Sequence, residues 1–123
     1  MKKVIILSLL LTSCYSVERN CLDFKTGVFE FSTSINDSIV KSTFTRTNEF
    51  EIETYNGIED SSTISWVNNC EFLLTKINPR TNQEKRPIRI KILRTYGEIY
   101  DFEYSQVSDA QKISRGSVTK ISE

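Results

Sequence analysis

The sequence predicts an all-β protein built as an antiparallel meander, and three observations support this prediction. Between residues 22 and 104, apolar and polar side chains alternate with the period of a strand that buries one face. Thr, Ile, Phe and Tyr are frequent there, and turn-forming residues recur at short intervals. Beyond the N-terminal segment, no region shows a sustained helical period. We therefore expect seven or eight short strands that form an open curved sheet or a small barrel.

The expected strands are separated by clusters of turn residues. They cover residues 24 to 32, 38 to 45, 49 to 55, 61 to 67, 70 to 77, 88 to 95 and 98 to 104, with a short final strand at 117 to 121. The connection from 78 to 87 contains both prolines and several charges, which is typical of a mobile loop. Residues 105 to 116 are polar, so we expect them to be loosely ordered.

The register of the hairpin near Gly97 follows from the requirement that opposite residues share a face. A two-residue loop at Tyr96-Gly97 would mix core and solvent faces, whereas a three-residue loop at Thr95-Tyr96-Gly97 keeps them separate. The longer loop also puts glycine at a left-handed position. The pairs that it predicts are Ile92 with Tyr100, Ile90 with Phe102, Ile88 with Tyr104, Lys91 with Asp101, and Arg89 with Glu103.

The same face test predicts two further three-residue loops and the centre of the core. It places Phe44 opposite Phe50 in one hairpin, and Trp66 opposite Cys70 in another. Phe50 would also meet Trp66 across the hairpin between them. We therefore expect Phe50, Trp66 and Cys70 to form the middle of the core.

Asn56-Gly57 has the sequence of a tight turn but fails the face test. A two-residue turn there would put Ile52 opposite Ser61. A longer loop from 55 to 61 would let Ile52 meet Ile64 instead, so we predict the longer loop.

Residues 1 to 13 have the organisation of a helical signal peptide. Two lysines follow Met1, and the apolar run from Val4 to Leu11 is too short to span a bilayer. The sequence Leu11-Thr12-Ser13-Cys14 resembles the lipobox of bacterial lipoproteins. That resemblance implies that residues 1 to 13 are removed and that Cys14 is lipidated. The alternative is an ordinary secreted protein in which Cys14 is a thiol near the cleavage site.

A lipidated Cys14 would hold the protein on a membrane without crossing it, because each buried acyl methylene contributes about 0.8 kcal/mol. Tyr15 stands where inner-membrane lipoproteins carry a retaining aspartate, so the resemblance implies the outer membrane. Residues 15 to 20 lack an acidic run, which favours the periplasmic face, with cell-surface exposure as the alternative. Residues 14 to 21 would form a lipidated tether and residues 22 to 123 a single β domain.

The charge balance gives no reason to expect a nucleic-acid partner. The chain has 16 basic and 16 acidic residues, and removal of the signal peptide leaves 14 basic residues and a formal charge of −2. A nucleic-acid-binding protein needs a concentrated basic face, which this balance argues against.

Three cysteines cannot all pair with one another, but once Cys14 is assigned to lipid, two remain that can form one disulfide. We predict a disulfide between Cys21 and Cys70, since the exported compartment is oxidising. Two free buried thiols are the alternative. A metal site is disfavoured, because two cysteines without histidine make a poor ligand set.

The densest positive charge lies in the loop from 78 to 87 and in the strand after it. The predicted register gives Arg89 and Lys91 acidic partners across the hairpin. Arg80, Lys85 and Arg86 therefore remain as candidate binding residues for an anionic envelope polymer, such as lipopolysaccharide or peptidoglycan. The alternative is a solvated loop.

The chain offers little for catalysis. It contains no histidine, which removes Ser-His-Asp and Cys-His arrangements and histidine metal sites. Adjacent carboxylates such as Glu59 and Asp60 point to opposite faces of a strand, so no spacing indicates acid–base chemistry. Phosphate-binding and calcium-binding loop motifs are also missing. We expect no catalytic residue, no metal site and no cofactor.

Two family resemblances bear on function. Gly27-x-Phe29 is similar to the Gly-x-Trp opening of lipocalin-like domains, without the tryptophan. The chain also resembles a group of small uncharacterised envelope lipoproteins of Bacteroidota. The resemblance rests on three segments: Cys21-x-Asp23-Phe24-x-x-Gly27-x-Phe29, Arg46-Thr47 and Trp66-x-x-x-Cys70-x-Phe72-x-Leu74.

We expect a non-catalytic, membrane-anchored envelope lipoprotein whose loops bind another envelope component, either a protein or a polymer. One alternative is a lipocalin-like carrier with a small apolar ligand beside Trp66, in a cavity lined by aromatic residues. Such residues more often form a solid core, which would exclude the carrier. A further alternative is an inhibitor of a host or competitor hydrolase.

Overall fold

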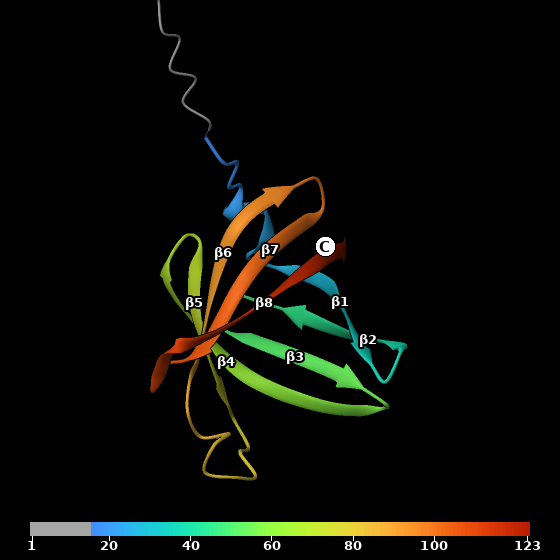
Figure 1. The fold of residues 1–123 in the computed structure, drawn as a ribbon, viewed down its shortest axis with the longest axis vertical. Helices are drawn as coiled ribbons and strands as arrows, with labels where there is room; N and C mark the ends of the chain where they lie inside the picture. The colour runs from blue at the N-terminus through green and yellow to red at the C-terminus, as the bar shows by residue number, and fades with distance from the viewer. Residues whose placement is uncertain (1–15) are drawn as a thin grey trace, which may run out of the picture.

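The computed structural model describes residues 16–123, which form one short 3₁₀ helix and a closed antiparallel barrel of eight strands (Figure 1). The strands follow one another around the barrel in chain order, and β8 closes it by pairing with β1. The elements are η1 (Cys21–Phe24), β1 (Gly27–Ile35), β2 (Ser38–Arg46), β3 (Phe50–Tyr55), β4 (Ile58–Asn68), β5 (Glu71–Lys76), β6 (Ile88–Tyr96), β7 (Ile99–Gln106) and β8 (Asp109–Ser122). The predicted all-β meander is confirmed, in its barrel form. The expected signal peptide and Cys14 lie outside the described residues.

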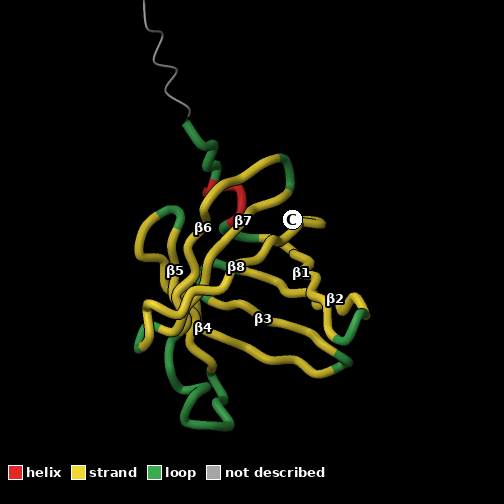
Figure 2. Tube along the Cα trace, in the orientation of Figure 1, coloured by secondary structure: helices red, strands yellow, loops and turns green. Residues whose placement is uncertain are grey.

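The meander places alternate connections at opposite ends of the barrel. The connections at 47–49, 69–70 and 97–98 lie with η1 at one end, which we call the closed end. The connections at 36–37, 56–57, 77–87 and 107–108 lie at the other end, which we call the open end. In Figure 2, η1 and the long loop 77–87 are accordingly far apart, on opposite sides of the strands.

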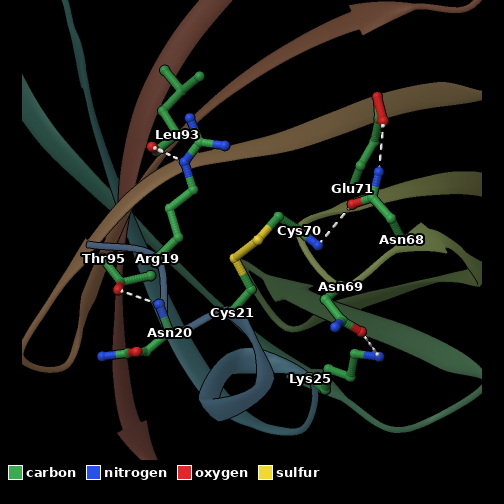
Figure 3. Close-up of a disulfide and its surroundings, with 10 residues drawn as sticks. All are labelled: Arg19, Asn20, Cys21, Lys25, Asn68, Asn69, Cys70, Glu71, Leu93 and Thr95. Carbon is green, nitrogen blue, oxygen red and sulfur yellow. Dashed lines mark hydrogen bonds between the residues drawn. A yellow bond between two sulfur atoms is a disulfide. The ribbon is translucent and has the colours of Figure 1, made fainter. Parts of the chain in front are cut away.

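The closed end is filled by η1 and fastened by a disulfide. Phe24 is only 1% exposed, and its ring meets the ring of Tyr100 edge to face at 5.1 Å between centroids. Cys21 in η1 is bonded to Cys70 in the β4–β5 turn, which confirms the predicted disulfide (Figure 3). A bridge across this separation of 49 residues stabilises the fold by about 4 kcal/mol in the chain-entropy model.

The end of the expected tether also lies against the barrel. The amide of Thr95 donates to the Glu18 carbonyl at 2.9 Å, and the amide of Asn20 donates to the Thr95 hydroxyl at 2.7 Å. Arg19 Nε donates to the Leu93 carbonyl at 3.0 Å (Figure 3). Residues 18–20 therefore run along β6 before η1 begins.

The predicted register of the β6–β7 hairpin is wrong. Ile92 lies opposite Phe102 instead of Tyr100, and the turn is the two-residue Gly97-Glu98. Leu93 is an extra residue on β6 and forms a bulge. With a two-residue turn and no bulge, Ile92 and Ile90 would point away from the interior, and the extra residue turns them back toward it. The other observed pairs are Ile90 with Tyr104, Ile88 with Gln106, Lys91 with Glu103, and Arg89 with Ser105.

The predicted β3–β4 loop is also wrong. Asn56 and Gly57 form a two-residue turn, and both have positive φ, as a type I′ turn requires. Ile52 therefore does lie opposite Ser61, while Glu53 lies opposite Asp60. The face test failed because it assumed that the inward face of these strands is apolar.

The predicted registers of the β2–β3 and β4–β5 hairpins are wrong as well. Phe44 lies opposite Glu53 rather than Phe50, and Phe50 is 40% exposed. Trp66 lies opposite Phe72 rather than Cys70, with a bulge at the residue between Trp66 and Asn68. The expected centre of the core is thus wrong. The buried cluster is instead made by Cys21, Phe24, Phe29, Phe44, Ile92, Tyr100, Phe102 and Val118.

The expected loose segment from 105 to 116 is a strand over most of its length. β7 reaches Gln106, and β8 runs over 14 residues from Asp109. β8 pairs with β7 along its length and with β1 from Val118 onward. Backbone pairing with β7, and not an alternating side-chain pattern, therefore fixes the polar residues 109–116.

Candidate functional site

A cavity of about 230 Å³ lies in the barrel beside the packed closed end, and it is open to solvent, as the 39% exposure of its lining residue Tyr104 shows. Every second residue of a strand points inward, so each strand contributes only a few side chains to the wall. Most of this wall is aromatic or aliphatic. Its apolar residues are Phe31, Phe44, Leu74, Ile88, Ile90, Phe102, Tyr104 and Val118.

Arg46 forms the polar floor of the cavity, although it is only 2% exposed. Its Nη1 donates to the Phe24 carbonyl at 2.7 Å, which ties the end of β2 to η1. Its Nη2 donates to the Tyr100 hydroxyl at 2.9 Å, and its Nε donates to Glu51 Oε2 at 3.0 Å. All three guanidinium nitrogens are therefore bonded, as a buried charge requires.

Burial perturbs all three groups of this floor. It disfavours the charge of Arg46, but Tyr100 and Glu51 outweigh that effect and raise the pKa of the guanidinium. Burial raises the pKa of the Glu51 carboxyl, against the opposing effect of Arg46. It also raises the pKa of Tyr100, so the phenol stays protonated. The floor is an ion pair with a neutral hydroxyl beside it.

Glu53 is the next inward residue of β3 after Glu51, and it also lines the cavity. It lies between Phe44 of β2 and Asp60 of β4 in the sheet. None of the ion pairs within residues 16–123 involves Glu53. The cavity thus has one carboxylate that no side-chain cation of the described chain neutralises.

Toward the open end, a second hollow of about 280 Å³ lies beside the cavity. The two share Glu51, Glu53, Leu74 and Ile88, and the second is bordered by residues of the loop 77–87. We call this second space the mouth.

Lys76 fastens the loop 77–87 to the barrel wall beside the mouth. Its Nζ lies 2.8 Å from Asp60 Oδ2 and 3.0 Å from Glu84 Oε1. Glu84 Oε2 also accepts a 2.6 Å hydrogen bond from the amide of Arg80. The hydrogen bond from Lys76 lowers the pKa of Glu84, and the bonds to both carboxylates raise the pKa of Lys76. One side chain therefore holds the loop against β4 and β5.

Trp66, a predicted binding residue, does not line the cavity. Its ring lies 4.6 Å from the ring of Phe72, and Lys25 Nζ lies 4.9 Å from its centre. Because Lys25 follows η1, this contact belongs to the closed end. The cavity exists, but it is not beside the tryptophan.

The three predicted basic residues do not converge. Arg80, Lys85 and Arg86 are all exposed in the loop 77–87. Arg86 borders the mouth, Arg80 borders an adjoining hollow near Tyr55 that shares four lining residues with the mouth, and Lys85 borders neither. Arg89 faces Ser105 and pairs with Glu71, so its predicted pairing with Glu103 is wrong.

The sequence reasoning missed Arg46, Glu51, Glu53 and Tyr100 as a group. A usable signal was present, because Arg46 continues the inward series that begins at Ser42 and Phe44. An arginine at the end of such a series lies on the core face and needs a buried partner. The assumption that charged residues point outward hid this signal.

Within residues 16–123, no group of three or more Cys, Asp and Glu side chains is arranged to hold a metal ion. The same residues include no helix with the length and hydropathy needed to cross a membrane. Comparison of the chain with protein-family models, curated proteins and solved structures gives no match. The site must therefore be interpreted from its own chemistry.

Proposed function

We propose that this protein is a non-catalytic, lipid-anchored binding protein of the cell envelope that holds a small ligand with an apolar body inside its barrel. The observation that carries this proposal is the solvent-accessible cavity with its aromatic and aliphatic wall. Ligand pockets are typically apolar spaces with a few fixed polar groups, and here the Arg46–Glu51 pair and Tyr100 supply those groups.

The geometry favours the carrier alternative over loops that dock another envelope component. Arg80, Lys85 and Arg86 do not line a common hollow, whereas the cavity and the mouth share four lining residues. A cavity of about 230 Å³ is smaller than most drug-sized pockets. The ligand is therefore small, or it extends from the cavity into the mouth.

The anchor would orient the binding site. Residues 18–20 approach the barrel at the closed end, so an acylated Cys14 would attach the protein there (Figure 1). The mouth would then open away from the membrane surface. Mass spectrometry of the membrane fraction should find acyl chains on Cys14. A soluble, unmodified protein would contradict the anchor but leave the binding site untouched.

Ligand binding can be tested with N-phenylnaphthylamine, a neutral apolar dye whose fluorescence rises in an apolar site. Ser42 lines the cavity on β2, and Ser42→Phe would fill part of the space. Thr45→Phe is the matched control, because Thr45 is exposed on the same strand. We expect the dye to bind wild type and Thr45→Phe alike and to lose about tenfold in affinity for Ser42→Phe. Absence of saturable binding to wild type would refute the carrier.

A further inference from the structure

We infer that the ligand of this cavity carries a cationic amine on its apolar body. This inference deepens the proposed function and rests on it. It is based on the charge of the lining, the aromatic wall, and the arrangement of cations at the mouth.

The lining has one carboxylate in excess. Arg46 and Glu51 neutralise each other across 3.0 Å, so the floor contributes no net charge. Glu53 lies beside this pair and has no ion-pair partner among the described residues. Glu53 is exposed at the edge of the apolar wall, so a cationic group entering the cavity would meet its carboxylate there.

The interior of this barrel already accommodates a cation among aromatic rings. The guanidinium carbon of Arg46 lies 4.7 Å from the ring centre of Phe29 and 4.6 Å from that of Phe72. Ring faces attract cations through their quadrupole, and alkylammonium groups use the same interaction. The cavity next to Arg46 is lined by Phe31, Phe44, Phe102 and Tyr104, so a ligand amine would find similar partners.

The side chains of the mouth preserve this negative excess. Lys76 is held by two carboxylates, Asp60 and Glu84, and Arg86 is the other cation that borders the mouth. The cavity and the mouth together are lined by four carboxylates and three cations: Glu51, Glu53, Asp60 and Glu84, against Arg46, Lys76 and Arg86. Arg80 lines an adjoining hollow that also includes Glu53, so the excess is confined to the cavity and the mouth.

The inference can be tested with three probes that share one octyl chain: octylamine, octan-1-ol and octanoate. Titration calorimetry of the purified protein at neutral pH measures each affinity. We expect octylammonium to bind about tenfold more tightly than octanol, and octanoate to bind most weakly. Glu53→Gln should bring the affinity for octylammonium down to that for octanol and leave octanol binding unchanged.

Glu59→Gln is the matched control. Glu59 lies on the neighbouring strand β4, is exposed, and does not border the cavity or the mouth, so this variant removes the same charge from the outside. It should keep the preference for octylammonium. Equal binding of the three probes, or tighter binding of octanoate, would overturn the amine inference while leaving the carrier intact. Failure of all three probes to bind would overturn both proposals.

Discussion

The two ends of the barrel differ in what their polar groups do. At the closed end, Arg46 bonds through all three nitrogens, and the Cys21–Cys70 bridge joins η1 to the wall. At the open end, Glu53 lacks an ion-pair partner within the described chain, and two hollows meet beside it. The same strands pass through both regions. One end of this small barrel thus concentrates the buried bonds that stabilise the fold, whereas the other end holds the hollows proposed as the binding site.

The largest effect is expected from Arg46→Met at the boundary between the two ends. The variant leaves Glu51 as a buried carboxylate without its cation, and the Phe24 carbonyl loses a donor. Breaking a buried ion pair from one side costs about 3 kcal/mol or more. Urea denaturation should show a loss of this size in the free energy of unfolding.

The double variant Arg46→Met/Glu51→Leu separates the penalty of an unpaired charge from the value of the pair. Replacing a buried pair by apolar residues is often close to neutral, so the double variant should recover most of the stability. A double variant as unstable as Arg46→Met would show that Arg46 stabilises through its ring contacts and its bond to Phe24 instead.

A smaller effect is expected from a pair of glycine substitutions that compares the two regions directly. Gly27 starts β1 with φ +135°, and a Cβ there would lie 2.8 Å from the Ser122 carbonyl oxygen. Gly116 of β8 is different, because its Cβ would meet only the rings of Phe102 and Phe31, at 3.0 and 3.1 Å. These rings border the cavity and have room to move.

We therefore expect Gly27→Ala to lower the free energy of unfolding by about 2 kcal/mol, through strain against the backbone. Gly116→Ala should cost about 1 kcal/mol, and the displaced rings should weaken dye binding in the cavity. Thermal unfolding and dye titration measure the two effects. Equal costs at both positions would show that the cavity gives Phe31 and Phe102 no freedom to move.

Much of the fold could be predicted, because strand alternation and the cysteine count are local or arithmetic signals. The registers of the hairpins could not be predicted in this way. They depended on the rule that apolar residues face apolar residues, and this rule rejected Asn56-Gly57 although its sequence fits a tight turn. It also missed the bulge at Leu93, because nothing in the side-chain pattern marks an extra residue.

The same rule concealed the candidate site. Glu51 bonds to Arg46 in the floor of the cavity, and Glu53 and Asp60 line the mouth. A pattern that assigns every charge to the outer face misses all three. The expected strand from 38 to 45 also stops one residue short of Arg46, which the structure places at the inward-facing end of β2. The register errors and the missed site therefore have one cause, since binding sites are where sequences break the pattern that specifies the fold.

The smallest and most local effect is expected at the loop 77–87, which Lys76 holds to the open end. Lys76→Met removes both ion pairs, yet exposed pairs contribute little to global stability. The free energy of unfolding should stay close to that of wild type. The amide of Arg80, which donates to Glu84, should exchange its hydrogen faster, as measured by NMR and normalised to the intrinsic rate.

Acid should have the same local effect in wild type, because the pKa of Glu84 is lowered in the fold. A lowered pKa gives stabilisation that is complete above the ordinary value of about 4.3 and is lost as the pH falls through the lowered value. Protection of the Arg80 amide should therefore fall below about pH 4. The amide of Ile92, which donates to the Cys70 carbonyl at the closed end, is the control and should keep its protection. If both amides lost protection together, the loop would not open independently of the barrel, and the two ends would respond to acid as one cooperative unit.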